Sequence, residues 1–330
     1  MRNFAELYSS LNDIAKTDEK INLLVEYLKS SNPDDSIWAI YFLIGRKPKQ
    51  IIPLRKLKQW SLELAKIPDW LFDESYKAVG DLIKTITLLL PKSTNSTDKS
   101  LHYWIEEKLL LLNNIEENLK KEEMISAWNE MNKKERAVWN KLVTGSFRVG
   151  VSLKLVVKAL SVFSGVDEPV LSYRLIGRWK PNVDFFKQLV SIDSKDVGSC
   201  KPYPFYFAYQ IMGDVEDLGE LKNWRAEWKW DGIRVQLIKR QGIFLIWSHR
   251  EGILNEKFPE FENFISFLPE GIVIEGAIIA WQNKKPLPFG ELQRRIDRKN
   301  ITKKTTSTIP AVFMAYDLLE LKSKDLRNKP

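Results

Sequence analysis

The amino-acid sequence predicts a two-domain chain in which an all-α helical domain is followed by an α+β domain. Apolar residues in the N-terminal half recur every three or four positions, which is the period of an amphipathic helix. From Ile233 onward apolar and polar residues alternate, which is the period of a β-strand. The two patterns meet near residues 193–214, a segment rich in proline and aromatic residues. We therefore place the domains at residues 1–195 and 205–330.

The helical period predicts the first elements of the N-terminal domain. One stripe of apolar residues predicts a helix near residues 4–14 and a second predicts one near 21–28. A third helix is expected to begin at Asp34 and Asp35, whose carboxylates favour a helix N-terminus, and to stop at Gly45. The polar segment 91–100 lacks apolar periodicity and is predicted to be a loop between the halves of a helix bundle.

Two basic elements in this domain are candidates for contact with an acidic polymer. The first follows Gly45, and its cations are Arg46, Lys47, Lys49, Arg55, Lys56 and Lys58. An ordinary solvated charged face would explain this element equally well. The second has Gly145 and Gly150 flanking Arg148, followed by an apolar helix that carries Lys154. Glycines at a helix entrance let backbone N–H groups approach a phosphate, and such contacts position a duplex without reading its sequence.

Composition narrows the class of protein. The chain has 330 residues, of which 44% are hydrophobic and 28% charged, and its formal net charge is +8. The positive charge favours an acidic polymer as partner. No apolar run is long enough to span a bilayer, and the first residues do not form a signal peptide, so we expect a cytoplasmic protein.

The cysteine and histidine content limits the kind of metal site. The single cysteine, Cys200, cannot form an internal disulfide. With only His102 and His249 available, far apart in the sequence, no cysteine/histidine zinc site can be assembled. Any metal ion would therefore need oxygen ligands.

In the C-terminal domain the spacing predicts antiparallel sheets with helices packed on them. A hairpin is expected where residues 233–237 and 243–247 flank a break at Gly242. Residues 272–281 and 311–318 are predicted to be further strands. Apolar residues on one face predict helices near residues 258–268 and 289–296.

Lys229, within the segment EWKWDGIR, is the candidate nucleophile. A lysine amine attacks phosphorus only when it is unprotonated, so its charge must be disfavoured by an apolar wall or by neighbouring cations. Trp228, Trp230 and Arg234 are candidates to supply both. Asp231 and Gly232 favour a turn that would fix the lysine at a strand end, in a loop between strands. The alternative is an exposed hairpin lysine beside an Asp-Gly pair that merely closes the turn.

The pattern Lys-x-Asp-Gly-x-Arg at 229–234 resembles the nucleotidyltransferase signature of ATP-dependent DNA ligases, RNA ligases and mRNA capping enzymes. Further segments follow in the same order as in that superfamily: WSHREG (247–252), VIEGAIIAW (273–281) and FMAYDLLE (313–320). The segments FAELY, SIWAIYFLIGRKPKQIIP, PDWLFDESYKAVGDL, FRVGVS and PLPFGELQRRI are similar to those of bacterial ATP-dependent DNA ligases with an N-terminal DNA-binding domain. The resemblance covers nearly the whole chain. It implies a helical DNA-binding domain followed by an α+β nucleotidyltransferase (adenylation) domain.

The resemblance also implies roles for individual residues. Lys229 would be the catalytic nucleophile. The expected nucleotide contacts are Glu227 to the adenine amino group, Arg234 to the ribose side, His249 and Arg250 in the Ser-Arg element, Glu275 in the Asp-Gly-Glu strand, and Tyr316 as the ring that stacks on adenine. Phe313 is the alternative stacking ring, although core packing explains it better. The expected DNA-binding residues are Arg46, Lys47, Arg148 and Lys154, and no metal ligand is assigned.

Three departures from the family pattern predict reduced activity. His249 stands where the family has arginine, with Arg250 adjacent. Ala277 stands where the family has the glutamate of Asp-Gly-Glu. The sequence given stops at Pro330, before the family's later glutamate strand, its Lys-x-Lys pair and its oligonucleotide-binding barrel. We expect a ligase that is truncated at its C-terminus.

The expected function is therefore that of an ATP-dependent DNA ligase that seals nicks in duplex DNA through a lysine–AMP intermediate, in DNA repair, recombination or replication. The resemblance implies ATP and Mg²⁺ as cofactors. It implies nicked duplex DNA and a repair helicase as partners of a monomeric chain. The alternatives are a non-catalytic duplex-binding protein that works through residues 1–190, and an RNA ligase.

Overall fold

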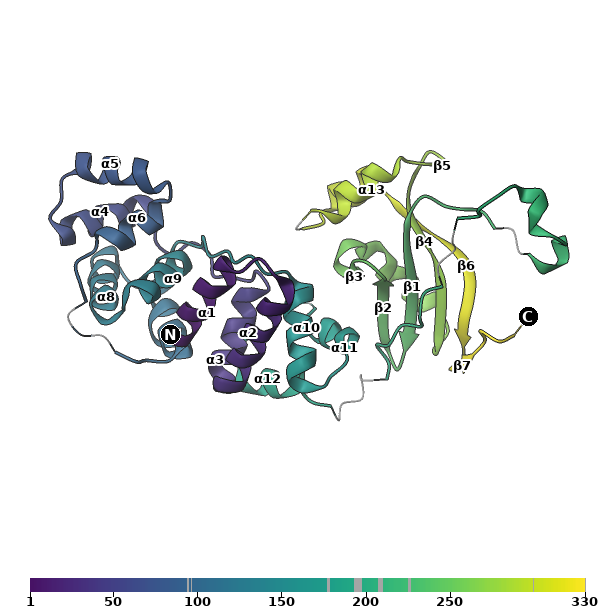
Figure 1. Ribbon diagram of the computed structural model, residues 1–330, viewed down its shortest axis with the longest axis horizontal. Coiled ribbons are helices and arrows are strands. Elements are labelled where there is room, and N and C mark those ends of the chain that lie inside the picture. The colour runs from purple at the N-terminus through teal and green to yellow at the C-terminus, as the bar shows by residue number, and fades with distance from the viewer. Residues whose placement is uncertain are drawn as a thin grey trace. The chain divides into compact units, whose positions relative to one another are not determined.

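The computed structural model describes residues 1–93, 95, 97–176, 179–192, 198–206, 210–224, 227–298 and 300–329. The chain divides into two compact units, Met1–Val166 with Arg178–Ser191, and Asp167–Gly177 with Ile192–Pro330. The first unit is helical and the second is built on a sheet (Figure 1). Parts of the predicted boundary region, residues 193–197 and 207–209, lie outside the described residues, as does Pro330.

The helices of the first unit follow the predicted apolar stripes. The expected first two helices are confirmed, and segment 91–100 contains no helix or strand among its described residues. The elements are α1 (Arg2–Asp13), α2 (Thr17–Ser30), α3 (Pro33–Leu43), α4 (Leu54–Ala65), α5 (Asp69–Val79), α6 (Leu82–Leu89), α7 (Leu101–Tyr103), a π-helical turn (Trp104–Leu109), a 3₁₀ turn (Leu111–Asn114), α8 (Glu117–Glu130), α9 (Lys133–Val143), α10 (Leu153–Ser164) and α12 (Val183–Leu189).

Helix α3 begins at Pro33, one residue before the predicted start at Asp34. The side chain of Asn32 accepts a hydrogen bond from the backbone N–H of Asp35 at 2.7 Å, and Pro33 occupies the first helical position. An asparagine cap followed by proline satisfies one orphan amide and removes another. Asp34 and Asp35 lie in the first turn, where their charge favours the helix N-terminus.

An aromatic cluster holds α1, α2, α3 and the segment before α10 together. The ring centroid of Phe4 lies 6.2 Å from those of Tyr27 and Phe42 and 5.9 Å from that of Phe147. Phe147 is only 4% exposed. Burial of large rings removes much apolar surface from water, so Phe147 fixes the predicted basic segment 145–150 against the helices.

The described strands of the second unit form one seven-stranded antiparallel sheet in the order β3-β2-β1-β4-β6-β7, with β5 paired to β4. The predicted hairpin is confirmed as β1 and β2. The strands are β1 (Ile233–Arg240), β2 (Ile243–Ser248), β3 (Gly252–Ile253), β4 (Ile272–Gln282), β5 (Lys285–Pro286), β6 (Ala311–Leu321) and β7 (Lys324–Asp325). The unit also contains the α-helices α11 (Glu168–Arg174), α13 (Phe289–Ile296) and α14 (Lys303–Thr308). Its described 3₁₀ helices are Val215–Leu218, Leu221–Asn223, Asn255–Lys257 and Pro259–Phe267.

The two faces of the sheet have different chemistry because β1 and β4 alternate apolar and polar residues. In the antiparallel register Arg234 lies opposite Ala277 and Gln236 lies opposite Glu275, so these side chains share one face. The other face is the hydrophobic core, which contains Val235, Leu237, Ile246, Ile278, Phe258 and Leu292. The predicted helix near 258–268 is a 3₁₀ helix, Pro259–Phe267, rather than an α-helix.

Candidate nucleotide site and basic loop

Lys229 lies in an irregular segment that leads directly into β1. Gly232 is required here because a Cβ atom would lie 2.4 Å from the carbonyl oxygen of Ile278 and 3.0 Å from the side chain of Ile279. The glycine therefore lets the chain run close beside β4. The prediction of a loop between two strands is wrong in one respect. Within the described residues, no strand of the second unit precedes Lys229.

The predicted apolar wall around Lys229 is not formed. The lysine side chain is 93% exposed, and its Nζ atom lies 3.7 Å from a carboxylate oxygen of Asp231. Trp228 is 87% exposed. Trp230 instead meets Trp281 edge to face, with ring centroids 6.5 Å apart. The acidic side chain of Asp231, itself exposed, is therefore the charged group paired with the Lys229 amine.

Arg234, predicted as a cation beside the lysine, is paired with a buried acid on the sheet. Its Nε atom donates to Oε1 of Glu275 at 2.6 Å, and its terminal nitrogen forms an ion pair with the same oxygen. The other oxygen of Glu275 accepts from Gln236 at 2.9 Å. The guanidinium lies 5.5 Å from the ring centroid of Phe205 and 6.0 Å from that of Tyr316. These five side chains form what we call the Arg234 cluster.

A bulge between β4 and β6 brings Tyr316 into this cluster. Gly276 pairs with Ala315 and Glu275 with Asp317, so Tyr316 is the extra residue of β6. The Tyr316 hydroxyl lies 3.5 Å from Oε1 of Glu275. Burial raises the pKa of the Tyr316 phenol to about 12, so the ring keeps its proton at neutral pH.

Phe313, the alternative ring, does not belong to the Arg234 cluster. It pairs with Ile278 and packs against the hydrophobic core on the other face of the sheet. A Cβ atom on Gly276 would lie 2.5 Å from the Phe313 ring, so this glycine is required for the ring to pack there. The core-packing interpretation of Phe313 accounts for its position.

The remaining residues predicted to contact the nucleotide are not members of the Arg234 cluster. His249 follows β2, and its ring meets that of Phe205 edge to face at 5.6 Å. Arg250 and Glu227 are both exposed. Ala277 is buried opposite Arg234, where its methyl group can accept no hydrogen bond. The structure therefore brings Arg234, Glu275 and Tyr316 together, while the lysine lies outside their contacts.

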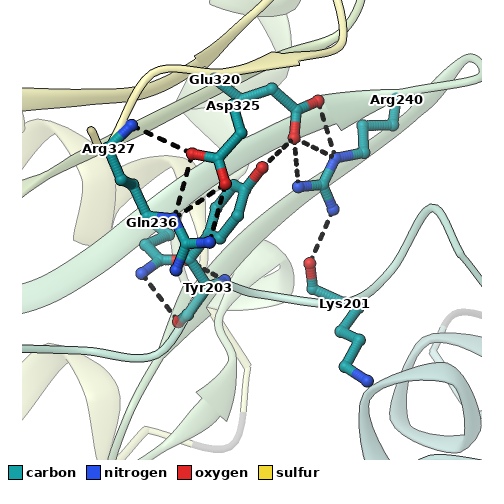
Figure 2. Close-up of polar contacts among 7 residues, drawn as sticks. All are labelled: Lys201, Tyr203, Gln236, Arg240, Glu320, Asp325 and Arg327. Atoms are coloured by element: carbon teal, nitrogen blue, oxygen red, sulfur yellow. Dashed lines mark hydrogen bonds and ion pairs between the residues drawn. The ribbon is translucent and has the colours of Figure 1, made fainter. Parts of the chain in front are cut away.

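A second polar network on the same face was not predicted from the sequence (Figure 2). The Gln236 side chain accepts from the Tyr203 amide at 2.8 Å and donates to the Tyr203 carbonyl at 3.0 Å. The Tyr203 hydroxyl donates to Glu320 at 2.8 Å, and Arg240 binds both oxygens of that carboxylate. Arg240 also donates to the carbonyl of Lys201 at 2.6 Å. Segment 201–205 is thereby held on the sheet.

Two guanidinium groups lie near the ring of Tyr203 in this network. The guanidinium of Arg240 lies 5.3 Å from the ring centroid and that of Arg327 lies 4.4 Å from it. Although burial opposes the change, hydrogen bonds from Arg240 and Tyr203 lower the pKa of the Glu320 carboxyl. Burial and the neighbouring Glu320 raise the pKa of Tyr203. The carboxylate therefore stays charged and the phenol stays protonated.

In the first unit, the two basic elements predicted from the sequence lie side by side. The amides of Ile51 and Ile52 both donate to the carbonyl of Val143, at 2.9 and 3.1 Å. The chain on either side of this contact carries the predicted DNA-binding residues. The periodicity of the sequence could not reveal this pairing because the two segments are far apart along the chain.

Several cations of the first element are engaged within the protein. Lys47 donates to the carbonyl of Gly145, and Arg46 lies 4.7 Å above the ring of Trp179. Lys56 pairs with Glu117 at 2.6 Å and Lys58 with Asp73 at 3.0 Å. The charge of this element is therefore smaller than the sequence indicates. In the second element Arg148, Lys154 and Lys158 are exposed.

Comparison with known proteins agrees with both halves of the fold. The model of the DNA ligase N terminus matches residues 1–161, and the model of the ATP dependent DNA ligase domain matches residues 210–330. A probable DNA ligase of Koribacter versatilis is 22% identical over 100% of this chain and 59% of its own length. DNA ligase 1 of Korarchaeum cryptofilum is 22% identical over 100% and 62%, and a DNA ligase of Methanosphaera stadtmanae is 25% identical over 76% and 52%.

The chain thus spans between 52% and 62% of the length of these three relatives. In the part of the chain that the structure describes, no helix has both the length and the apolar character needed to cross a membrane. The helical unit and the sheet unit carry the two ligase segments in the expected order, which confirms the resemblance seen in the sequence. The chain belongs to the family of ATP-dependent DNA ligases.

Proposed function

We propose that this chain joins nicked duplex DNA through a lysine–AMP intermediate, with Lys229 as the nucleophile. The observation that carries the proposal is the position of Lys229 directly before β1, the strand that also carries Arg234. Arg234, Glu275 and Tyr316 then provide a charged and aromatic surface on the face of the sheet next to that segment. Family membership supports the same reaction.

The reaction would begin when Lys229 Nζ, after losing its proton, attacks the α-phosphorus of ATP. The N–P bond forms, the bond from the α-phosphorus to the bridging oxygen breaks, and pyrophosphate leaves. A 5′-phosphate oxygen of the nick then attacks the AMP phosphorus and releases the lysine. Finally the 3′-hydroxyl loses its proton and attacks the 5′-phosphorus, and AMP leaves. The strand is then continuous.

The Arg234 cluster would bind the nucleoside part of ATP. Tyr316 supplies a ring for stacking on adenine, and it is held in place by the bulge in β6 and by Glu275. Arg234 is fixed by Glu275, and its guanidinium would contact the ribose side of the nucleotide. Glu227 lies two residues before the lysine and would accept from the adenine amino group. His249 and Arg250 would approach from the end of β2.

Two features of the site predict slow chemistry. The Lys229 side chain is 93% exposed, so no enclosed pocket excludes water from its amine. Ala277 offers no oxygen where the family has a glutamate, which removes one charged group from the site. We therefore propose a ligase whose covalent step is slower than that of its relatives.

Family membership also implies Mg²⁺, but the described residues do not form a site for it. Within that part of the chain, no group of three His, Cys, Asp or Glu side chains could hold a metal ion. Both oxygens of Glu275 already accept hydrogen bonds from protein side chains. We assign no metal ligand and derive no step through Mg²⁺, which enters the assays below only as the counterion of ATP.

The helical unit would bind the duplex through Arg148 and Lys154, which are exposed on the second basic element. Contacts of this kind go to phosphates and carry no sequence information. A repair helicase as partner and a monomeric state rest on the resemblance alone and remain expectations.

The proposal is tested by nick sealing with the full chain. A nicked duplex with a labelled 5′-phosphate is incubated with ATP and Mg²⁺, and denaturing gels resolve the adenylated and sealed strands. Wild type should produce both, and Lys229→Ala should produce neither, because no other amine can take the place of Nζ. The matched control is Lys222→Ala, an exposed lysine of the same segment that pairs with Glu220. Equal sealing by Lys229→Ala and Lys222→Ala would overturn the proposal.

A further inference from the structure

Three side chains from three separate elements hold the carbonyl groups of the loop formed by residues 145–150. Tyr8 of α1 donates its hydroxyl hydrogen to the carbonyl of Arg148 at 3.0 Å. Lys20 of α2 donates to the carbonyl of Gly150 at 2.8 Å. Lys47 donates to the carbonyl of Gly145. We call these three side chains the loop anchors.

The middle of the loop is packed like a part of the hydrophobic core. The buried ring of Phe147 lies 5.0 Å from the Tyr8 ring and 5.9 Å from that of Phe4. At one end, Gly145 has a φ of +64° and passes so close to Gln50 that a Cβ atom would lie 3.2 Å from its amide nitrogen. The loop conformation is therefore imposed by its surroundings.

The loop anchors bind carbonyl groups of the loop and none of its amides. The carbonyls of Gly145, Arg148 and Gly150 all accept from anchors. In contrast, within the described part of the chain the amides of Arg148, Val149 and Gly150 have no protein acceptor. A short run of amides without acceptors, next to an exposed arginine, suits an anionic oxygen. Phosphates of a duplex are the anions that the proposed function supplies.

We infer that Tyr8, Lys20 and Lys47 are positioning residues for duplex binding, which hold the loop so that Arg148 and the neighbouring amides meet DNA phosphates. This inference rests on the proposed function of the helical unit. It changes the role of Lys47, which the sequence predicted to contact DNA. Its ammonium binds a backbone carbonyl and is used inside the protein. Lys20 and Tyr8 had no predicted role in binding.

Loss of the Tyr8 hydroxyl distinguishes positioning of the loop from a direct contact between a cation and a phosphate, because this hydroxyl is neutral. A cation that neutralises one phosphate adds about 0.9 to the slope of log affinity against log salt. Loss of the Tyr8 hydroxyl removes no charge, so the slope should stay unchanged while affinity falls. Removal of Arg148 should lower both the affinity and the slope, the latter by about 1.

The experiment compares Tyr8→Phe with Tyr76→Phe, which alters an exposed tyrosine of α5. Binding of the full chain to a fluorescent nicked duplex is measured across a salt series. Tyr8→Phe should bind about fivefold more weakly, the order expected for one lost hydrogen bond, with an unchanged slope and an unchanged melting temperature. Tyr76→Phe should bind like wild type.

A second readout needs no DNA. Trypsin cleaves after Arg148 only when the loop leaves its anchored conformation, so cleavage there should be faster in Tyr8→Phe than in Tyr76→Phe. Likewise Lys20→Met should be cleaved faster and bind more weakly than Lys29→Met, which removes the same charge from the other end of α2.

Each outcome bears on the inference. Equal affinity and equal cleavage for Tyr8→Phe and Tyr76→Phe would overturn it, even if Arg148→Ala binds poorly and the proposed function stands. Weaker binding without faster cleavage would also overturn it, because the loop would then not depend on its anchors. If wild type binds no duplex at any salt concentration, the proposed function fails first, and the inference fails with it.

Discussion

Gln236 donates to Glu275 across the β1–β4 pair, with 2.9 Å between the amide nitrogen and the carboxylate oxygen. Both side chains are buried, at 0% and 4% exposure. The bond leaves the other carboxylate oxygen for Arg234, and the Gln236 amide also binds both backbone groups of Tyr203. Gln236 therefore links the Arg234 cluster to the network that holds segment 201–205.

Replacing Gln236 with leucine should lower the free energy of unfolding by about 1–3 kcal/mol, because a buried carboxylate oxygen and two backbone groups lose their partner. Urea unfolding followed by circular dichroism measures the change. The control is Gln293→Leu on the exposed side of α13, which should change the free energy of unfolding by less than about 0.5 kcal/mol. Similar values for the two variants would contradict the assigned role of Gln236.

The ion pair between Arg240 and Glu320 should make the stability of the fold depend on pH in the acid range. The folded-state pKa of Glu320 is lowered, so its contribution is fully present above the unfolded value of about 4.5 and is lost as pH falls through the folded value. Melting temperatures between pH 7 and the acid limit of folding should fall more steeply for wild type than for Glu320→Gln. Parallel curves would show that this pair does not contribute to acid sensitivity.

The two aromatic residues of β6 should respond differently to alanine. Tyr316→Ala should weaken ATP binding by roughly tenfold with a small change in stability, because base stacking on a ring contributes about 1–3 kcal/mol. Phe313→Ala should instead lower the free energy of unfolding by roughly 3 kcal/mol, because its ring packs on the core. Calorimetric titration with ATP and urea unfolding give the two quantities. Loss of ATP binding in a fully stable Phe313→Ala would reverse the assignment.

Duplex binding should be non-specific and strongly salt-dependent. Arg148→Ala combined with Lys154→Ala should weaken binding to duplexes of different sequence alike and should lower the salt slope by about 2, because two phosphate contacts are removed. Fluorescence anisotropy of the full chain across a salt series measures both. A matched pair of exposed lysines on α5 and α9, Lys77→Ala with Lys133→Ala, serves as control. A slope that is the same in both double variants would argue against this DNA surface.

The elements that the sequence predicted are those whose signal is local. Phe4, Leu7 and Leu11 share one face of α1, and the alternation from Ile233 to Leu237 marks β1, because both periods are set by neighbours along the chain. The structure also places Tyr316 and Phe313 on opposite faces of the sheet, because of their odd spacing across a bulge, and the stacking role of Tyr316 stays a prediction.

The features that the sequence did not predict depend on long-range partners. Phe205 and Tyr203 belong to a proline-rich stretch with no periodic signal, yet they contact Arg234 and Gln236 on the sheet. In the sequence Lys47 is one cation among several, and only the fold brings its ammonium to the carbonyl of Gly145. The apolar wall expected around Lys229 depended on Trp228 and Trp230. Their nearness in the sequence does not determine the direction in which their side chains point.

Covalent labelling of the chain with α-labelled ATP and Mg²⁺ tests the central claim most directly. The account predicts an adduct that forms slowly, survives denaturation and maps to Lys229, because a covalent N–P bond withstands a treatment that releases bound ATP. Lys229→Ala should abolish the label, Lys222→Ala should keep it, and Ala277→Glu should increase it modestly by restoring an acid beside Arg234. A label that persists in Lys229→Ala, or a folded wild-type chain that takes up no label, would contradict the account.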